Sequence, residues 1–262
     1  MFQKFNPSKF IEENLKSHTF EEVLDLLYKK AKNSFLKFIK ESYSDFKDKY
    51  LNTLTKNVNI LEIIFKQLDP IQYGAYNAKT KTFTDTINDT NYKDIKLLTP
   101  AETLKYKRGT CYEQSILTAY MASQHHLEYS CSYYLNICGN THMACSVNYQ
   151  GKWYWLEHAW YNRKKLYGPF DDLNDINSLT CSYLYMEYHA PIILHIPNFN
   201  VSKFFKGKHM NTEITDCYSE KCIDIMGYYN DNQIKNIKMD KNHIATNIIL
   251  KNGTSIIIKG LF

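Results

Sequence analysis

The stretch from His142 to Trp160 limits the possible folds most, because its pattern predicts a single β-hairpin. Residues 142–149 and 152–160 are rich in aromatic, β-branched and small apolar side chains, as strands commonly are. Gln150-Gly151 between them fits a two-residue turn. The chain is therefore expected to contain an antiparallel sheet, and the turn determines which residues of the two strands face one another.

The register that this turn imposes brings an imidazole close to a carboxylate. A two-residue turn pairs Tyr149 with Lys152 and thereby sets every other pair along the two strands. His142 and Glu157 then become diagonal neighbours on one face of the sheet, about 7–8 Å apart at the backbone and within side-chain reach. His158 points to the other face, because successive side chains of a strand alternate. A slip of one residue would break the pairing of His142 with Glu157.

A second feature, upstream of the hairpin, is a cysteine at the predicted start of a helix. Thr110 followed three residues later by Glu113 is a capping box with Thr110 as N-cap, which makes Cys111 the first helical residue. A thiol in this position meets free amide hydrogens and the positive end of the helix dipole, and both favour the nucleophilic thiolate. Gly109 leaves room for a substrate backbone to approach the sulfur.

The order of these groups along the chain predicts nucleophilic catalysis. A single cysteine is most often a small buried hydrophobe, and a single histidine on a strand is most often structural. Together, however, Cys111, His142 and Glu157 supply a nucleophile, a base that takes its proton, and an acid that orients the base and fixes its tautomer. The joint pattern favours the catalytic interpretation over the structural one.

Several segments around these residues resemble the core of the transglutaminase-like superfamily. The segments are Thr99–Leu104, Gly109–Gln114, Thr141-His142, Gly151–Trp160 and Gly168–Phe170. The resemblance covers about residues 70–190 and is strongest to the bacterial and phage branch with a Cys-His-Glu pattern. It implies an α+β, papain-like core in which the nucleophile helix packs on an antiparallel sheet. It also implies Cys111 as nucleophile, His142 as base and Glu157 as orienting acid, although most of the superfamily has an aspartate in the third place.

Two further site residues are predicted with less support from the pattern. Acyl chemistry needs donors for the oxyanion, and the amide of Cys111 is the natural first one. The resembling family commonly adds an aromatic or amide donor from upstream. Gln72, Tyr73 and Tyr76 are all candidates for it, and Tyr73 is the one named here. Trp155 shares the predicted sheet face of Glu157 and is expected to contact substrate, although aromatic residues on strands are core residues by default.

The predicted function is thiol-dependent acyl transfer through a thioester, at a peptide bond or a glutamine carboxamide of a protein or peptide substrate. Transfer to water would make the protein a cysteine peptidase or amidase, and transfer to an amine would make it an acyltransferase. Three alternatives stay open. The segment Arg108–Gln114 also resembles the nucleophile segment of arylamine N-acetyltransferases, the scaffold could be a non-catalytic binding module, and residues 1–68 could carry the function as a helical interaction region.

Composition limits the partners, the cellular location and the cofactors expected for such an enzyme. The net charge of +5 is modest and spread along the chain, so no nucleic-acid footprint is predicted. No secretory signal and no apolar run of membrane-spanning length is evident, and the seven cysteines lack regular spacing, so a cytoplasmic protein without disulfides is expected. Cys217 and Cys222 with His209 upstream form only a weak zinc signature, so neither a metal nor a cofactor is predicted.

Three regions are predicted along the chain: a helical cap at 1–68, the catalytic core at 69–190 and a small strand-rich extension at 191–262. In the cap, Thr19 and Glu22 form a capping box, and a second helix near 43–68 ends at Asp69-Pro70. The other expected elements are a long loop with one short helix at 71–98, a strand near 129–138, a helix over 171–187, and a hairpin turning at Asn252-Gly253.

Overall fold

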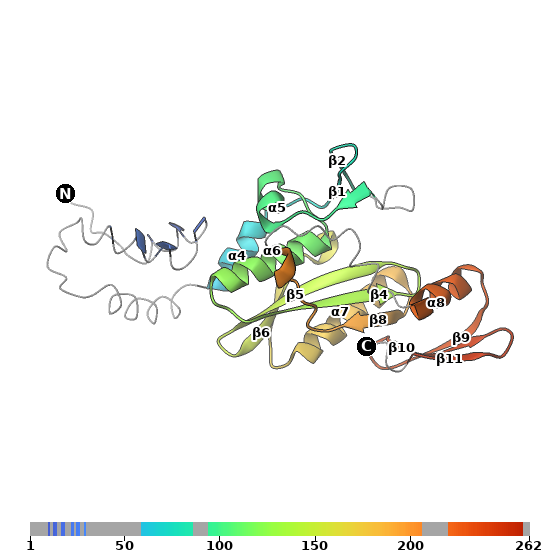
Figure 1. Cartoon of the computed structure of the whole chain (residues 1–262). Coiled ribbons are helices and arrows are strands. Elements are labelled where there is room, and N and C mark those ends of the chain that lie inside the picture. The colour runs from blue at the N-terminus through green and yellow to red at the C-terminus, as the bar shows by residue number, and fades with distance from the viewer. Residues whose placement is uncertain are drawn as a thin grey trace.

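The computed structural model describes residues 59–85, 94–205 and 220–258, together with single positions between Phe10 and Lys29. Over the three long stretches the chain is a mixed α+β protein with five helices and three antiparallel sheets (Figure 1). The predicted capping residue Thr19 and residues 43–58 of the predicted second helix lie outside the described residues.

The largest sheet has five strands in the order β7-β6-β5-β4-β8. Its strands are β4 (Tyr129–Asn136), β5 (Thr141–Tyr149), β6 (Lys152–Glu157), β7 (Lys165–Phe170) and β8 (Ile192–Ile196). The last of these lies beyond residue 190, where the core was expected to end, yet it pairs with β4. The central sheet therefore extends past the predicted boundary at 190, because a strand that follows a helix can return to the far edge of the same sheet.

The register of the central hairpin is the one that the two-residue turn predicts. β5 and β6 pair Tyr149 with Lys152 and Ser146 with Trp155. Gln150 and Gly151 have φ values of 55° and 78°, as a turn with two left-handed residues requires. β6 ends at Glu157 rather than at Trp160, so the carboxylate lies at the end of the strand.

Helices cover both faces of this sheet (Figure 1). Helix α6 (Cys111–Gln124) packs on the face that bears Met143 and Cys145, and Ile116 lies in the same buried cluster as these two residues. Helix α7 (Leu173–Tyr188) covers the opposite face, where Ala144 and Trp155 share a cluster with α7 side chains. The predicted helix over 171–187 is confirmed with a start two residues later, capped by Asp172, whose side chain accepts a hydrogen bond from the amide of Asn174.

Two shorter helices precede α6. Helix α4 (Ile60–Leu68) buries its apolar residues against the C-terminal half of α6, in a cluster that includes Leu117 and Met121. It ends at Asp69, before Pro70, as predicted. Helix α5 (Pro100–Tyr106) follows, with Pro100 at its first position, where a missing amide hydrogen costs nothing.

The segment at 71–98 was expected to be a long loop with one short helix, and residues 86–93 of it lie outside the described residues. Its described residues instead form a small sheet of β1 (Ala75–Asn77), β2 (Thr82–Thr84) and β3 (Ile95–Lys96), in the order β2-β1-β3. The side chain of Asn77 accepts hydrogen bonds from the amides of Lys79 and Thr80 and so closes the turn between β1 and β2. This local turn chemistry outweighs the polar, loop-like composition of the segment.

The C-terminal stretch contains the predicted hairpin but is not a separate strand-rich unit. It consists of α8 (Glu220–Asn230), which was not predicted, followed by β9 (Ile234–Met239), β10 (Ala245–Leu250) and β11 (Ser255–Ile257). The turn at Asn252-Gly253 joins β10 to β11, and Gly253 has φ +88°. Ile225 and Ile248 belong to the same buried cluster as Cys111 and Ile116, so this stretch packs onto the core.

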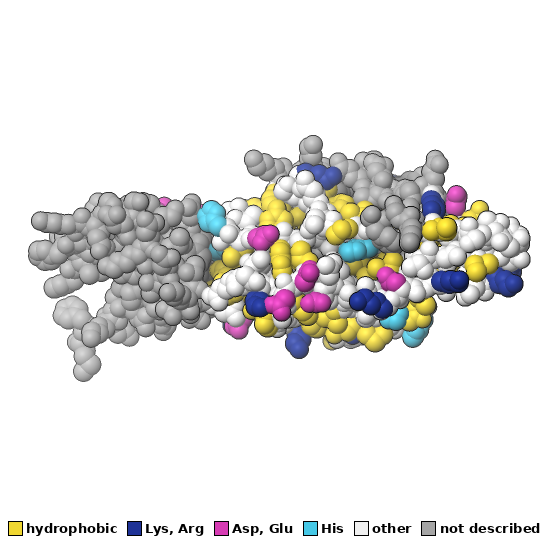
Figure 2. Space-filling view, turned by 90° about the horizontal axis from the view of Figure 1, so that it is seen from below, with side chains coloured by type: hydrophobic (Ala, Val, Ile, Leu, Met, Phe, Trp, Pro, Cys, Tyr) yellow, Lys and Arg dark blue, Asp and Glu magenta, His cyan; other side chains and the backbone are white. Residues whose placement is uncertain are grey.

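The face of the molecule seen from below carries a mixture of side-chain types. Figure 2 shows apolar, basic and acidic groups interleaved over this face, with no continuous band of lysine and arginine among the coloured residues. Among the helices of the described part of the chain, none has both the length and the apolar composition needed to cross a bilayer.

Candidate active site

Cys111 begins α6, as the capping box predicts. The Thr110 hydroxyl accepts a hydrogen bond from the amide of Tyr112, and the carboxylate of Glu113 accepts one from the amide of Thr110 at 2.8 Å. The sulfur-bearing residue is thus held at the end of the helix where amide hydrogens are unpaired. Cys111 is buried, with 6% of its surface exposed.

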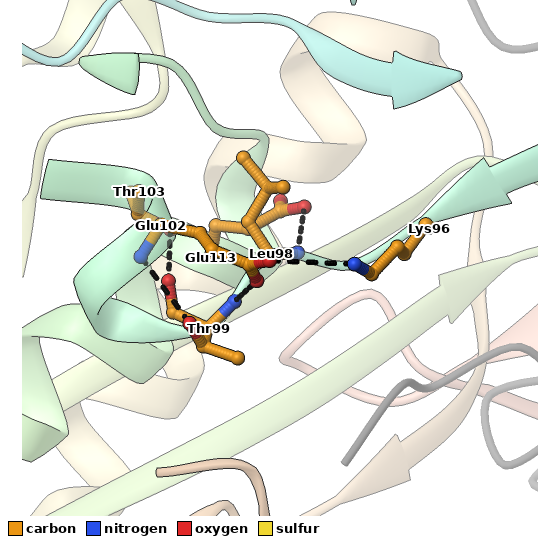
Figure 3. A network of polar contacts seen from close by, with 6 residues as sticks. All are labelled: Lys96, Leu98, Thr99, Glu102, Thr103 and Glu113. Carbon is orange, nitrogen blue, oxygen red and sulfur yellow. Dashed lines mark hydrogen bonds and ion pairs between the residues drawn. The ribbon is translucent and has the colours of Figure 1, made fainter. Parts of the chain in front are cut away.

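The carboxylate of Glu113 ties the start of α6 to the strand and loop in front of α5. Glu113 accepts a hydrogen bond from the amide of Leu98 at 3.3 Å, and a second capping box, between Thr99 and Glu102, follows at once (Figure 3). Burial raises the pKa of Glu113, and the hydrogen bonds from Thr110 and Leu98 oppose that shift. These contacts fix the backbone on both sides of the nucleophile.

Gly109 is needed for packing against this carboxylate. A β-carbon at position 109 would lie 2.7 Å from the Cβ of Glu113, closer than side chains tolerate. Packing against Glu113 therefore explains the glycine at position 109 without the expected role of making room for a substrate.

The segment that contains Tyr73 lies alongside the residues preceding Cys111. The amide of Gln72 donates to the carbonyl of Lys107 at 2.9 Å, and the amide of Gly109 donates back to the carbonyl of Gln72 at 3.0 Å. The Arg108 guanidinium donates to the carbonyl of Tyr73 at 3.0 Å. This pairing brings the backbone at Tyr73, far away in sequence, next to the residues that precede Cys111.

His142 and Glu157 form a buried pair. The Nε2 atom of His142 lies 2.9 Å from Oε2 of Glu157, and the two side chains are 7% and 2% exposed. The other carboxylate oxygen, Oε1, accepts a hydrogen bond from the amide of Trp160 at 2.8 Å. Because both oxygens are engaged, the carboxylate has one orientation, and the Trp160 ring, 5.2 Å from that of His142, covers the imidazole.

The electrostatics of His142 link this pair to the cysteine. Burial alone would lower the pKa of His142, but the charge of Glu157 and a hydrogen bond with the Cys111 side chain together raise it to about 10. Nε2 is taken by Glu157, so Nδ1 is the ring nitrogen left for the thiol. The structure therefore brings together the three residues that the sequence placed in one site.

Two tyrosines lie near enough to Cys111 for it to raise their pKa values. Partial burial raises the pKa of Tyr73, and the nearby Cys111 and Glu113 raise it further, although 44% of the residue is exposed. Burial followed by the influence of Cys111 also raises the pKa of Tyr188, the last residue of α7. Sequence reasoning missed Tyr188, because nothing in a helix end signals which distant site it meets.

Trp155 does not occupy the position expected of a substrate contact. Its side chain is completely buried and stacks on Tyr167 at 4.8 Å, with Tyr183 at 6.1 Å. It thus has no surface to present to a substrate, and the core role that is the default for a strand aromatic applies. Trp160 and Tyr183, which are half-buried, lie closer to the triad surface.

No metal centre is found among the described residues, which contain no group of three or more side chains able to ligate one. Of the weak zinc signature, Cys217 and His209 lie outside the described residues, and Cys222 is buried in the core. His125 caps the C-terminal end of α6, and burial lowers its pKa to about 4.

The fold and the site together define an α+β protein with a buried cysteine, histidine and glutamate arranged at one end of its central sheet. Family models, curated proteins and solved structures were all compared with the chain, and none of them matches it.

Proposed function

We propose that the protein is a thiol-dependent acyl-transfer enzyme with a transglutaminase-like core, acting at a peptide bond or glutamine carboxamide of a protein or peptide. The observation that carries the proposal is the buried pair of His142 and Glu157, 2.9 Å apart, with Cys111 close enough to the imidazole to help raise its pKa. Nucleophile, base and orienting acid within hydrogen-bond reach are the arrangement that covalent acyl transfer requires.

The reaction begins with a proton on the imidazole. His142 holds the Cys111 proton, and the raised pKa of His142 favours an imidazolium balanced by Glu157. The sulfur attacks the substrate carbonyl, and a new carbon–sulfur bond forms as the carbonyl oxygen becomes an oxyanion. Collapse of this intermediate breaks the carbon–nitrogen bond, and the leaving amine takes its proton from His142. The resulting thioester passes its acyl group to water or to a second amine, whose proton returns through His142.

The oxyanion needs donors that point at the attacked carbonyl. The amide of Cys111, at the open end of α6, is the first donor, and the hydroxyl of Tyr73 is assigned as the second. A phenol serves this role while protonated, and the raised pKa of Tyr73 keeps it so over the neutral range. The same argument makes Tyr188 a neighbour that shapes access to the sulfur.

The test is to incubate the full-length protein with a glutamine-containing peptide, with and without a fluorescent primary amine. Released ammonia, free acid and amine-coupled peptide are then measured together. Hydrolysis yields ammonia and acid, whereas transfer yields ammonia and the coupled product. Rapid acid quenching followed by intact-mass spectrometry detects the thioester on Cys111.

Two variants make the experiment specific to this thiol. Cys111→Ser is expected to abolish turnover and the thioester, whereas Cys138→Ser, which changes an exposed cysteine outside the site, is expected to retain both. Glu157→Gln is expected to lower turnover but leave residual activity, because it removes orientation and not the nucleophile. Equal turnover by the wild type and Cys111→Ser would contradict the proposal.

A further inference from the structure

A cationic side chain borders the candidate site on the face of the sheet covered by α7. Trp160, whose ring covers His142, is followed by the short 3₁₀ helix η2 (Tyr161–Arg163). The guanidinium carbon of Arg163 lies 5.2 Å from the centre of the same Trp160 ring. One indole therefore contacts both the imidazole of the triad and this cation.

Aromatic rings hold the Arg163 guanidinium in place. Its central carbon lies 4.1 Å from the Tyr183 ring centre, and the rings of Trp160 and Tyr183 meet edge to face at 89°. The hydroxyl of Tyr167 donates to the Arg163 carbonyl at 2.8 Å and anchors the backbone. A guanidinium stacked on aromatic rings loses little further freedom when it binds a planar anion.

The charge of Arg163 is not balanced by any acid in the part of the chain that the structure describes. Its Nε is shielded from water and has no acceptor there. Glu157 does not neutralise it, because its oxygens already accept from His142 and from the Trp160 amide. The neighbouring Lys164, by contrast, is paired with Asp69 at 3.1 Å.

A second cation lies on the same edge. Lys165 is the cross-strand partner of Glu157 in the pairing of β6 with β7. Its ammonium lies 5.6 Å from the Tyr167 ring centre, and it too makes no ion pair with a described acid. Two positive charges that no described acid neutralises therefore lie beside the imidazole–carboxylate pair, and they favour a negatively charged ligand.

We propose that Arg163 is a specificity-determining residue that binds a carboxylate of the substrate, so that the preferred substrates are peptides with an acidic residue close to the attacked carbonyl. Guanidinium and carboxylate match as planar groups that share two parallel hydrogen bonds. The inference rests on the proposed function, since it places the acidic residue relative to the carbonyl that Cys111 attacks.

Reagents that differ only in one charge test this without knowledge of the natural substrate. Iodoacetyl-Gly-Glu-amide and iodoacetyl-Gly-Gln-amide both alkylate a thiolate, with sulfur displacing iodide to form a thioether. Site-resolved mass spectrometry follows the rate at Cys111 and separates it from the other cysteines. The wild type is expected to react with the glutamate reagent roughly tenfold faster than with the glutamine reagent, as one charge-assisted contact would give.

Variants assign that preference to Arg163. In Arg163→Gln the ratio of the two rates is expected to fall towards one, and in Arg163→Lys, which keeps the charge but not the fork, to fall part of the way. Lys238→Gln, which removes an exposed charge from β9, is the matched control and should keep the wild-type ratio. Because both reagents meet the same protein, a ratio stays interpretable even if a variant is less stable.

The outcomes separate the two proposals. Equal rates in the wild type, or a preference that survives Arg163→Gln unchanged, overturn the role of Arg163 while leaving the reactive thiol in place. Failure of both reagents to label Cys111 overturns the proposed function, and with it this inference.

Discussion

The end of β6 carries two histidine–carboxylate pairs that lie back to back, and only one of them has the features of a catalytic pair. On one face Glu157 meets His142 at 2.9 Å, and on the other face the next residue, His158, meets Asp69 at 3.1 Å. The distances are similar, yet the two imidazoles are shifted in opposite directions. The pKa of His142 is raised, whereas burial and the nearby Lys164 lower that of His158.

The difference lies in the surroundings of each acid. Glu157 is 2% exposed and has no cation bound to its oxygens, so its charge acts on His142 with little screening. Asp69 is 55% exposed and shares its Oδ1 between His158 and Lys164. A histidine beside a carboxylate is therefore not in itself a base for catalysis. For catalysis, the carboxylate must be buried and must bind the histidine without a competing cation. The second ring nitrogen of the histidine must face a nucleophile.

The largest expected effect comes from removing each histidine in turn. His142→Asn should lower the turnover of a glutamine peptide by roughly 10³–10⁴-fold, because the base is lost. His158→Asn should leave turnover close to that of the wild type, since its ring faces Asp69 and Phe65 on the other side of the sheet. Steady-state kinetics measure both, and thermal unfolding shows that each variant is folded. Equal losses in the two variants would mean that the pairs are not functionally distinct.

The geometry behind this comparison was largely predictable from local sequence. The left-handed turn at Gln150-Gly151 fixes the register, and that register puts Glu157 and His158 on opposite faces. The capping box of Thr110 and Glu113 fixes the start of α6 and hence the place of Cys111. Each is decided by residues a few positions apart, where backbone hydrogen bonding dominates.

Features that depend on distant segments were not predictable in the same way. Asp69 meets His158 across 89 positions of sequence, and Tyr188, at the end of α7, lies near enough to Cys111 for its pKa to be raised. Trp155 carries the same alternation signal whether its sheet face is open or covered, and only α7 makes it a core residue. The edge strand β8 was missed for the same reason, because its partner β4 lies beyond an intervening helix.

The second-largest expected effect is on the free energy of unfolding. Its pH dependence should differ between the His142–Glu157 pair and the His158–Asp69 pair. The folded-state pKa of His142, about 10, exceeds the ordinary value of 6.5, so the pair with Glu157 stabilises the fold fully below pH 6.5 and loses this contribution as the pH rises towards 10. Glu157→Gln should therefore lower the free energy of unfolding by about 3 kcal/mol at pH 6 and by much less at pH 10. Urea unfolding at a series of pH values measures this.

The pair of His158 and Asp69 should show the opposite pH dependence of stability in the same measurements. His158 has a lowered pKa, so its contribution is present above pH 6.5 and is lost as the pH falls through the folded-state value. His158→Asn should thus cost less stability in acid than at neutral pH. A destabilisation by Glu157→Gln that grows between pH 6 and pH 10 would contradict the assigned direction for His142.

The smallest expected effect comes from Lys164, a cation that binds the carboxylate of one pair, Asp69, and not that of the other, Glu157. Lys164 lies 3.1 Å from Asp69 and lowers the pKa of His158, so Lys164→Gln should raise that pKa slightly, because Asp69 then pairs with His158 alone. Nuclear magnetic resonance titration of the histidine ring protons measures the shift, with His158→Asn assigning the signal. His142 in the same spectra is the internal control, because its acid has no bound lysine to lose. An unchanged or lowered pKa of His158 would mean that burial alone causes the pKa difference between His142 and His158. The burial of the carboxylate would then matter more than whether the carboxylate also binds a lysine.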